Sequence, residues 1–97
     1  MRIEKKREDG RLTIVLDGRL DTNTSPELEA AMATEGSDDL VFDFAGLDYI
    51  SSAGLRVLLV ARKLTMASGR SMSVVNANET VRNVFEITGC REIFGLA

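Results

Sequence analysis

The stretch that decides the fold is "LVFDFAGLDYISSAGLRVLLVARK", residues 40–63. Residues 40–44 form a near-continuous apolar run of strand-favouring side chains, which predicts a central strand covered on both faces. After two serines the chain becomes apolar with helical spacing, which predicts a helix from Ala53 to about Ser68, closed by Gly69. The stretch is therefore a buried strand that leads directly into the longest helix of the chain.

The N-terminal segment has the pattern of a β-hairpin. "RIEKKRED", residues 2–9, is followed by Gly10 and by "RLTIVLDG", residues 11–18. The second arm alternates apolar residues with others at a period of two, as a half-buried strand does. Its inward positions are Leu12, Ile14 and Leu16. The first arm is more polar, and its lysines are typical of a protected edge strand.

A helix is expected within "LDTNTSPELEAAMATEG", residues 20–36. Thr24 and Glu27 have the spacing of a capping box, and Pro26 lies in the first turn, where its missing N–H costs little. The apolar stripe of this helix is Leu28, Ala31 and Met32. We expect Gly36 to end it.

The C-terminal third predicts one more strand and one more helix. "SMSVVN", residues 71–76, is the strand, and either Asn76 or Asn78 can cap the helix. Thr88 and Gly89 end it, before a short terminal element, "CREIFGLA". The residues expected to face the core are Val81, Val84 and Phe85. The resulting order, β-β-α-β-α-β-α, predicts an α/β domain with a mixed sheet that has parallel members.

Length and charge exclude several classes of protein. Ninety-seven residues, 44% of them hydrophobic, suit one domain with one modest core. A net charge of −3 argues against a general nucleic-acid binder. No apolar run is long enough to span a membrane, and the charged N-terminus lacks the apolar region of a secretory signal. A single cysteine, Cys90, cannot form an internal disulfide, so we expect a packed thiol and a cytoplasmic location.

The residue types and motifs that the sequence lacks exclude several kinds of catalytic and metal site. The chain has no histidine, which excludes Ser-His-Asp and Cys-His mechanisms and histidine-ligated metal sites. It also has no glycine-rich phosphate loop. Asp43 and Asp48 lie near the end of a predicted strand, but without a third ligand they are interpreted as solvated or hydrogen-bonded carboxylates. We therefore expect no metal and no cofactor.

The long helix has two faces at about 100° per residue. The predicted core face is Val57, Val60, Ala61, Leu64 and Ser68. A second row falls within about 60° and comprises Ser52, Arg56, Leu59 and Lys63. Because that row combines a hydroxyl, two cations and a leucine, it suits contact with another protein.

Three hypotheses cover the serines at the start of this helix. Ser51 or Ser52 can be an N-cap that accepts a first-turn amide. Ser52 can receive a phosphate, which would lie at the positive end of the helix dipole with Arg56 one turn away. A catalytic nucleophile has little support, because there is no histidine and no G-x-S-x-G elbow.

Three motifs, in this order along the chain, resemble the STAS domain family. They are "GRLDTNTSPELE", "LVFDFAGLDYISSAGLRVLLVARK" and "NANETVRNVFEITG", and the resemblance covers residues 1–97. More narrowly, the chain resembles the stand-alone bacterial anti-sigma factor antagonists. The resemblance implies a small mixed sheet of about four strands with helices packed mainly on one face.

The resemblance also implies a function without catalysis. Such a protein binds an anti-sigma factor that is also a serine kinase, and this frees the sigma factor. The kinase uses ATP to phosphorylate the serine at the start of the central helix, which ends binding. A metal-dependent serine phosphatase reverses the modification.

The family motif D-S-[ST]-G-L aligns with residues 51–55, so the implied phosphoacceptor is Ser52. Ser51 replaces a common aspartate and Ala53 replaces a serine or threonine, which puts kinase recognition in question. Asp21 matches a family aspartate near the phosphosite, and equally suits a turn residue that accepts local amides. The predicted partner surface is Asp21, Thr22, Asn23, Ser51, Ser52, Ala53, Arg56, Leu59 and Lys63.

Two other functions stay open at this level. The same fold could serve without a switch, as an adaptor in another signalling assembly or as a transporter accessory subunit. A small nucleotide-binding or hydrolytic α/β enzyme is the alternative from a different class.

Overall fold

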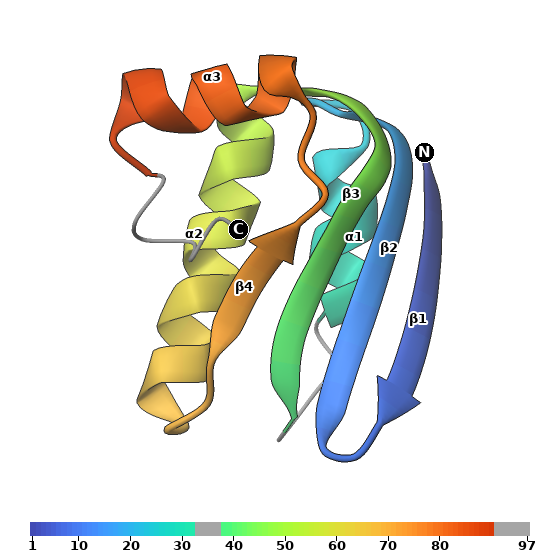
Figure 1. Cartoon of the computed structure of the whole chain (residues 1–97), viewed down its shortest axis with the longest axis vertical. Coiled ribbons are helices and arrows are strands. Elements are labelled where there is room, and N and C mark those ends of the chain that lie inside the picture. Colours follow the sequence, from blue (N-terminus) through green and yellow to red (C-terminus); the bar gives the residue numbers. More distant parts are fainter. Residues whose placement is uncertain (33–37, 91–97) are drawn as a thin grey trace.

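The structure, a computed structural model, describes residues 1–32 and 38–90. Its elements follow the predicted order, and Figure 1 shows their arrangement. They are β1 (Arg2–Glu8), β2 (Arg11–Leu20), α1 (Ser25–Met32), β3 (Asp39–Ile50), α2 (Ser52–Ala67), β4 (Met72–Val75) and α3 (Glu79–Thr88). The patterns of apolar residues and turn residues therefore predicted the type and order of each described element. The third strand is longer than predicted, because β3 continues from residues 40–44 to Ile50.

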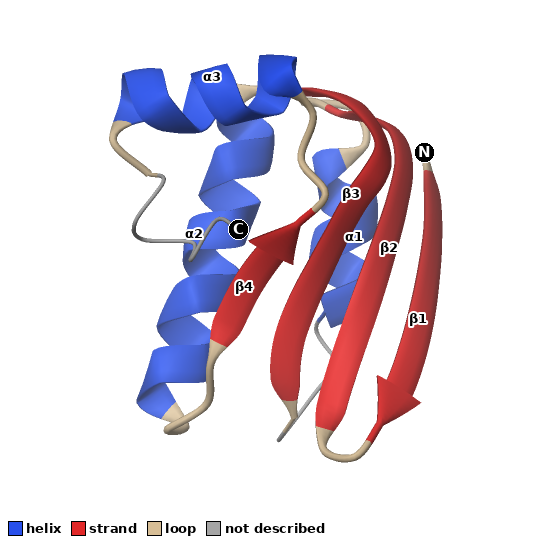
Figure 2. Ribbon diagram, in the orientation of Figure 1, coloured by secondary structure: helices blue, strands red, loops and turns tan. Residues whose placement is uncertain are grey.

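The four strands form one mixed sheet in the order β1-β2-β3-β4 (Figure 2). The hairpin pairs β1 antiparallel to β2, whereas β2 with β3 and β3 with β4 are parallel. Parallel neighbours need a crossover, and α1 and α2 supply the two crossovers. The predicted mixed sheet with parallel members is confirmed.

Helices α1 and α2 lie on the same side of the sheet, and α3 lies across the end where α2 begins (Figure 1). Right-handed crossovers that step in one direction along a sheet place their helices on one face. Residues along β3 therefore alternate: Leu40, Phe42 and Phe44 are buried, while Val41 and Asp43 are only half-buried. The prediction that this strand is covered on both faces is wrong, and helices packed mainly on one face are confirmed.

The core lies between the sheet and the helices. The largest side chains with almost no exposed surface are Phe42, Phe44 and Phe85, and the ring centroids of Phe44 and Phe85 are 6.4 Å apart. Leu12, Ile14 and Leu16 are buried as predicted. In α3, Val81 and Phe85 are buried and Val84 packs partly against the core.

The core face of α2 is rotated by about a quarter turn from the predicted one. Val57 and Ala61 are buried, but Val60, Leu64 and Ser68 are exposed. The observed buried set is Gly54, Leu55, Val57, Leu58, Ala61 and Thr65. Small residues in this set let α2 approach the sheet closely, and Thr65 satisfies its hydroxyl by donating to the carbonyl of Arg62 at 2.9 Å.

Helix ends mostly follow the predicted signals. Asn78 caps α3, because its side-chain oxygen accepts the amide of Val81 at 2.8 Å. Gly69 and Gly89 have φ of 69° and 71°, the left-handed conformation that ends α2 and α3. The predicted roles of Gly36 and of residues 91–97 lie outside the described residues; Cys90 is buried.

Candidate functional site

The junction of β3 and α2 is held against the end of β2. The amide of Ser51 donates to the carbonyl of Leu20 at 2.9 Å, and Leu20 and Ile50 are opposite one another in the parallel register. Gly54, in the first turn of α2, is buried against Leu20 and Ile50. This contact places the start of α2 beside the turn that follows β2.

The two serines at this junction have different roles in the structure. Ser51 is the N-cap: its backbone is extended, and its Oγ accepts the amide of Gly54 at 3.3 Å. Ser52 is exposed, and within the described residues its hydroxyl makes no hydrogen bond. The cap hypothesis therefore holds for Ser51, and the hydroxyl of Ser52 is available for modification.

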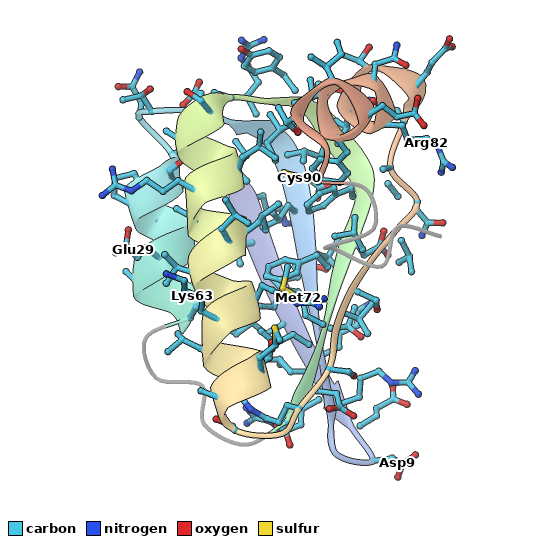
Figure 3. The ribbon with its side chains drawn as sticks, turned by 90° about the vertical axis from the view of Figure 1, so that its left-hand side faces the viewer. Asp9, Glu29, Lys63, Met72, Arg82 and Cys90 are labelled. Carbon is cyan, nitrogen blue, oxygen red and sulfur yellow. The ribbon has the colours of Figure 1, made fainter. Side chains whose placement is uncertain are left out.

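The predicted row on α2 lies on the side of the helix opposite the core. All of its members are exposed, and Leu59 keeps 38% of its surface open. Figure 3 shows Lys63 on α2 and Glu29 on α1 along the same side of the molecule. The row is Ser52, Arg56, Leu59 and Lys63. Its exposure is confirmed, and its contact with a partner stays a prediction.

The turn between β2 and α1 is organised by the carboxylate of Asp21. Its Oδ1 accepts the amides of Asn23 at 3.0 Å and Thr24 at 3.1 Å. The predicted capping box is wrong, because Asp21, and not the side chain of Glu27, satisfies the amide of Thr24. Asp21 thus fills the turn role that its sequence context allowed, and Thr22 and Asn23 are exposed beside it.

These hydrogen bonds lower the pKa of Asp21 below its ordinary value. The bond from the Thr24 amide is the largest cause, and the Asn23 amide and the Thr24 hydroxyl act in the same direction. Partial desolvation opposes them, and the nearby guanidinium of Arg19, 3.8 Å from Asp21 Oδ2, adds a smaller lowering effect. The turn is therefore built around a charged carboxylate.

We expect folding stability to depend on the ionisation of Asp21. Because its folded pKa is lowered, its contribution is fully present above the ordinary value of 3.8 and is lost as the pH falls through the folded pKa. Urea unfolding should therefore show a wild-type advantage over Asp21→Asn at neutral pH that shrinks in acid. Asp48→Asn, at an exposed carboxylate without a described hydrogen bond, is the control. If the difference in unfolding free energy between wild type and Asp21→Asn stayed constant from neutral pH to acid, the expectation would be contradicted.

A pair that sequence reasoning missed lies near the C-terminal ends of the two inner strands, β2 and β3. The guanidinium of Arg19 stacks over the ring of Tyr49 at 4.5 Å from its centroid, a cation–π contact. The two residues are 30 positions apart and meet because the parallel register sets Arg19 opposite Tyr49. No local pattern could indicate this contact, since it depends on strand pairing.

A groove of about 240 Å³ separates α1 from α2. It lies directly beside the row on α2, because Arg56 belongs to both. Its lining residues are Thr22, Ser25, Pro26, Glu29, Ala53, Arg56, Val57 and Val60. Three members of the predicted partner surface, Thr22, Ala53 and Arg56, therefore line one hollow together.

The remaining candidates have structural explanations. Asp43 Oδ1 accepts the amide of Ala45 at 3.0 Å and the side-chain amide of Asn76 at 3.1 Å, and Asp48 is exposed. Within residues 1–32 and 38–90 no three metal-binding side chains gather. None of the helices in these ranges combines the length and apolar character needed to cross a membrane.

The STAS domain family matches residues 2–97, and the chain belongs to this family. Bordetella bronchiseptica BtrV, whose name assigns it to the anti-sigma factor antagonists, is 40% identical over 101 residues, covering 100% of this chain and 86% of BtrV. The anti-sigma-B factor antagonist of Staphylococcus epidermidis is 27% identical over 96 residues, covering 96% of this chain and 89% of that protein.

Solved structures agree on the fold. The anti-sigma factor antagonist SpoIIAA in its unphosphorylated form matches with a TM-score of 0.86 at 22% identity, over 99% of this chain and 88% of that chain. The phosphorylated form of Bacillus SpoIIAA matches with a TM-score of 0.77 at 21% identity, over 99% of this chain and 91% of that chain. The architecture seen here is therefore the one found in SpoIIAA.

Proposed function

We propose that this protein is a cytoplasmic anti-sigma factor antagonist. It binds an anti-sigma factor that is also a serine kinase, and phosphorylation of Ser52 by that kinase ends the binding. The names of BtrV and of the Staphylococcus epidermidis relative support the antagonist role. The protein acts by binding and not by catalysis, in keeping with the absence of histidine from the chain.

The observation that carries the proposal is the unengaged hydroxyl of Ser52 at the start of α2. Because Ser51 already caps the helix, phosphorylation of Ser52 removes no hydrogen bond from the described fold. The phosphate would lie at the positive end of the helix dipole, where amides have no partner within the helix. The fold can therefore accept the added charge while the surface seen by the partner changes.

Arg56 is the side chain best placed to pair with that phosphate. It follows Ser52 by one helical turn, a spacing at which Cβ atoms are about 5–6 Å apart. Arg56 is exposed and makes no hydrogen bond or ion pair within the described residues. A guanidinium–phosphate pair would then replace the exposed hydroxyl with a rigid charged cluster, which a partner shaped for the hydroxyl cannot accommodate.

The serine that replaces the family aspartate keeps the helix start intact. Serine and aspartate are both strong N-caps, and Ser51 makes the capping bond here. The replacement removes a negative charge beside Ser52, so it bears on how the kinase recognises the site and not on the fold. We therefore expect that the cognate kinase has no basic side chain positioned to pair with an aspartate at position 51.

The test is phosphorylation by the cognate kinase, obtained by co-purification from the native host. Incubation with ATP should add one phosphate, which mass spectrometry should place on Ser52. Ser52→Ala should stay unmodified, whereas Ser51→Ala should still be modified. A metal-dependent serine phosphatase should then restore binding. A phosphate on Ser51 would contradict the assignment, and binding without any phosphorylation would identify an unswitched adaptor.

A further inference from the structure

Several large apolar side chains are exposed on α2. Within residues 59–66, Leu59 is 38% exposed, Val60 40%, Leu64 53% and Met66 62%. Single exposed apolar side chains are ordinary, but these form two pairs on the exposed side of one helix: at about 100° per residue Val60 is next to Leu64, and Leu59 is next to Met66. Together with Arg56 and Lys63 we name this surface the α2 outer face.

The α2 outer face is also basic. α2 contains Arg56, Arg62 and Lys63 but no aspartate or glutamate, although the whole chain has a net charge of −3. Neither Arg56 nor Lys63 forms an ion pair or hydrogen bond within the described part of the chain, and Glu29 across the groove is not paired with Arg56. A complementary surface would therefore combine apolar residues with acids.

The shape of the site favours a helix as its occupant. Val60 and Arg56 line the groove between α1 and α2, so the outer face continues directly into a hollow of about 240 Å³. An amphipathic helix laid along such a groove places apolar residues inward at three- and four-residue spacing and charged residues at its sides. This geometry matches the apolar pair Val60 and Leu64 and the cations Arg56 and Lys63, which lie beside that pair on the helix.

We infer that the α2 outer face binds an acidic amphipathic helix of the anti-sigma factor. Its apolar side chains pack on Val60 and Leu64, and its carboxylates pair with Arg56 and Lys63. The inference rests on the proposed function and names the contact that gives the complex its affinity beyond Ser52.

The far end of this face is outside the electrostatic reach of a phosphate on Ser52. Lys63 lies about 16 Å further along the helix axis, at about 1.5 Å per residue. Screening in physiological salt acts over about 8 Å. Phosphorylation therefore acts at the start of α2, where Arg56 lies, while the far end of the outer face, with Lys63 and Leu64, sets affinity and the choice of partner.

Charge reversal and cross-linking test the acidic character of the partner. The chain has three lysines, Lys5, Lys6 and Lys63, and the first two lie on β1. A zero-length carbodiimide cross-linker, applied to the complex with the co-purified anti-sigma factor, should join Lys63 to an aspartate or glutamate in a partner helix. Lys63→Glu should weaken binding about ten-fold, and Lys6→Glu should not change it.

Substitutions at Leu64 test the apolar part of the contact. Leu64→Ser should weaken binding about ten-fold, whereas Leu64→Met, which keeps the apolar surface, should bind like wild type. Circular dichroism checks that each variant is folded. Wild-type affinity in both Lys63→Glu and Leu64→Ser, with Ser52→Asp still binding about a hundred-fold more weakly, would overturn this inference and leave the proposed function intact. A wild-type protein that binds no anti-sigma factor would overturn both.

Discussion

Ser52→Asp is expected to lower the affinity for the anti-sigma factor by about a hundred-fold, and Ser52→Ala to leave it unchanged. The aspartate places a negative charge in the proposed interface, where burying a charged group costs about 3 kcal/mol in desolvation. The alanine removes a hydroxyl that makes no hydrogen bond in the described structure. Ser52→Ala should therefore bind the anti-sigma factor, and the kinase should be unable to end that binding by phosphorylation.

Titration calorimetry with the purified anti-sigma factor measures both affinities, and thermal melts confirm that the variants fold. Thr80→Asp is a matched control, because Thr80 is an exposed hydroxyl residue in the first turn of α3. It adds the same charge at a helix start outside α2. Equal loss of affinity in Ser52→Asp and Thr80→Asp would show a general effect of added negative charge and not a specific effect at position 52.

Gly54→Val is expected to reduce the free energy of unfolding by about 2–3 kcal/mol. A Cβ atom at Gly54 would lie 2.7 Å from Leu20 Cγ, 2.9 Å from the Leu20 carbonyl oxygen and 3.0 Å from Ile50 Cγ1. The carbonyl oxygen belongs to the backbone of β2 and cannot rotate away, so the start of α2 must move from the sheet. The gain in helix propensity over glycine, about 0.5 kcal/mol, does not offset this.

Chemical denaturation measures this loss, which corresponds to a fall in Tm of about 10–20 °C for a domain of this size. Ala67→Val is the matched control, because it introduces the same side chain at an exposed position of the same helix. It should change stability by less than about 0.5 kcal/mol. Gly54→Val with wild-type stability would mean that the close approach of α2 to β2 is not required. Because Ser52 moves with this turn, partner binding should weaken as well.

Much of the candidate site could be read from local sequence. A serine at the boundary between an apolar strand and a helix indicates a cap, and Ser51 is that cap. Helical periodicity placed Ser52, Arg56 and Lys63 in one row, and they lie in one exposed row. These features depend on backbone geometry within a few residues, which the order of residue types determines by itself.

The rotation of α2 was decided by tertiary packing. Apolar residues surround this helix, so their period does not single out a face, and Val60 and Leu64 were wrongly expected inside. The side of α2 that packs against the sheet is instead the one with Gly54 and Ala61, because small side chains let the backbones of helix and sheet come close. The bulkier apolar residues were left exposed on the outer face for which we infer a partner.

The sequence by itself determined which segments form strands and helices and which hydroxyl stands beside a cation one turn away. It left the cap of α2 open between Ser51 and Ser52, and the cap of α3 open between Asn76 and Asn78. Tertiary structure alone decided that both crossover helices cover one face of the sheet, so β3 alternates between buried and half-open positions. It also brought Arg19 onto Tyr49 and set the turn that follows β2 beside the start of α2. Those contacts depend on strand register and crossover handedness, which join residues far apart in the chain and leave no periodic signal within it.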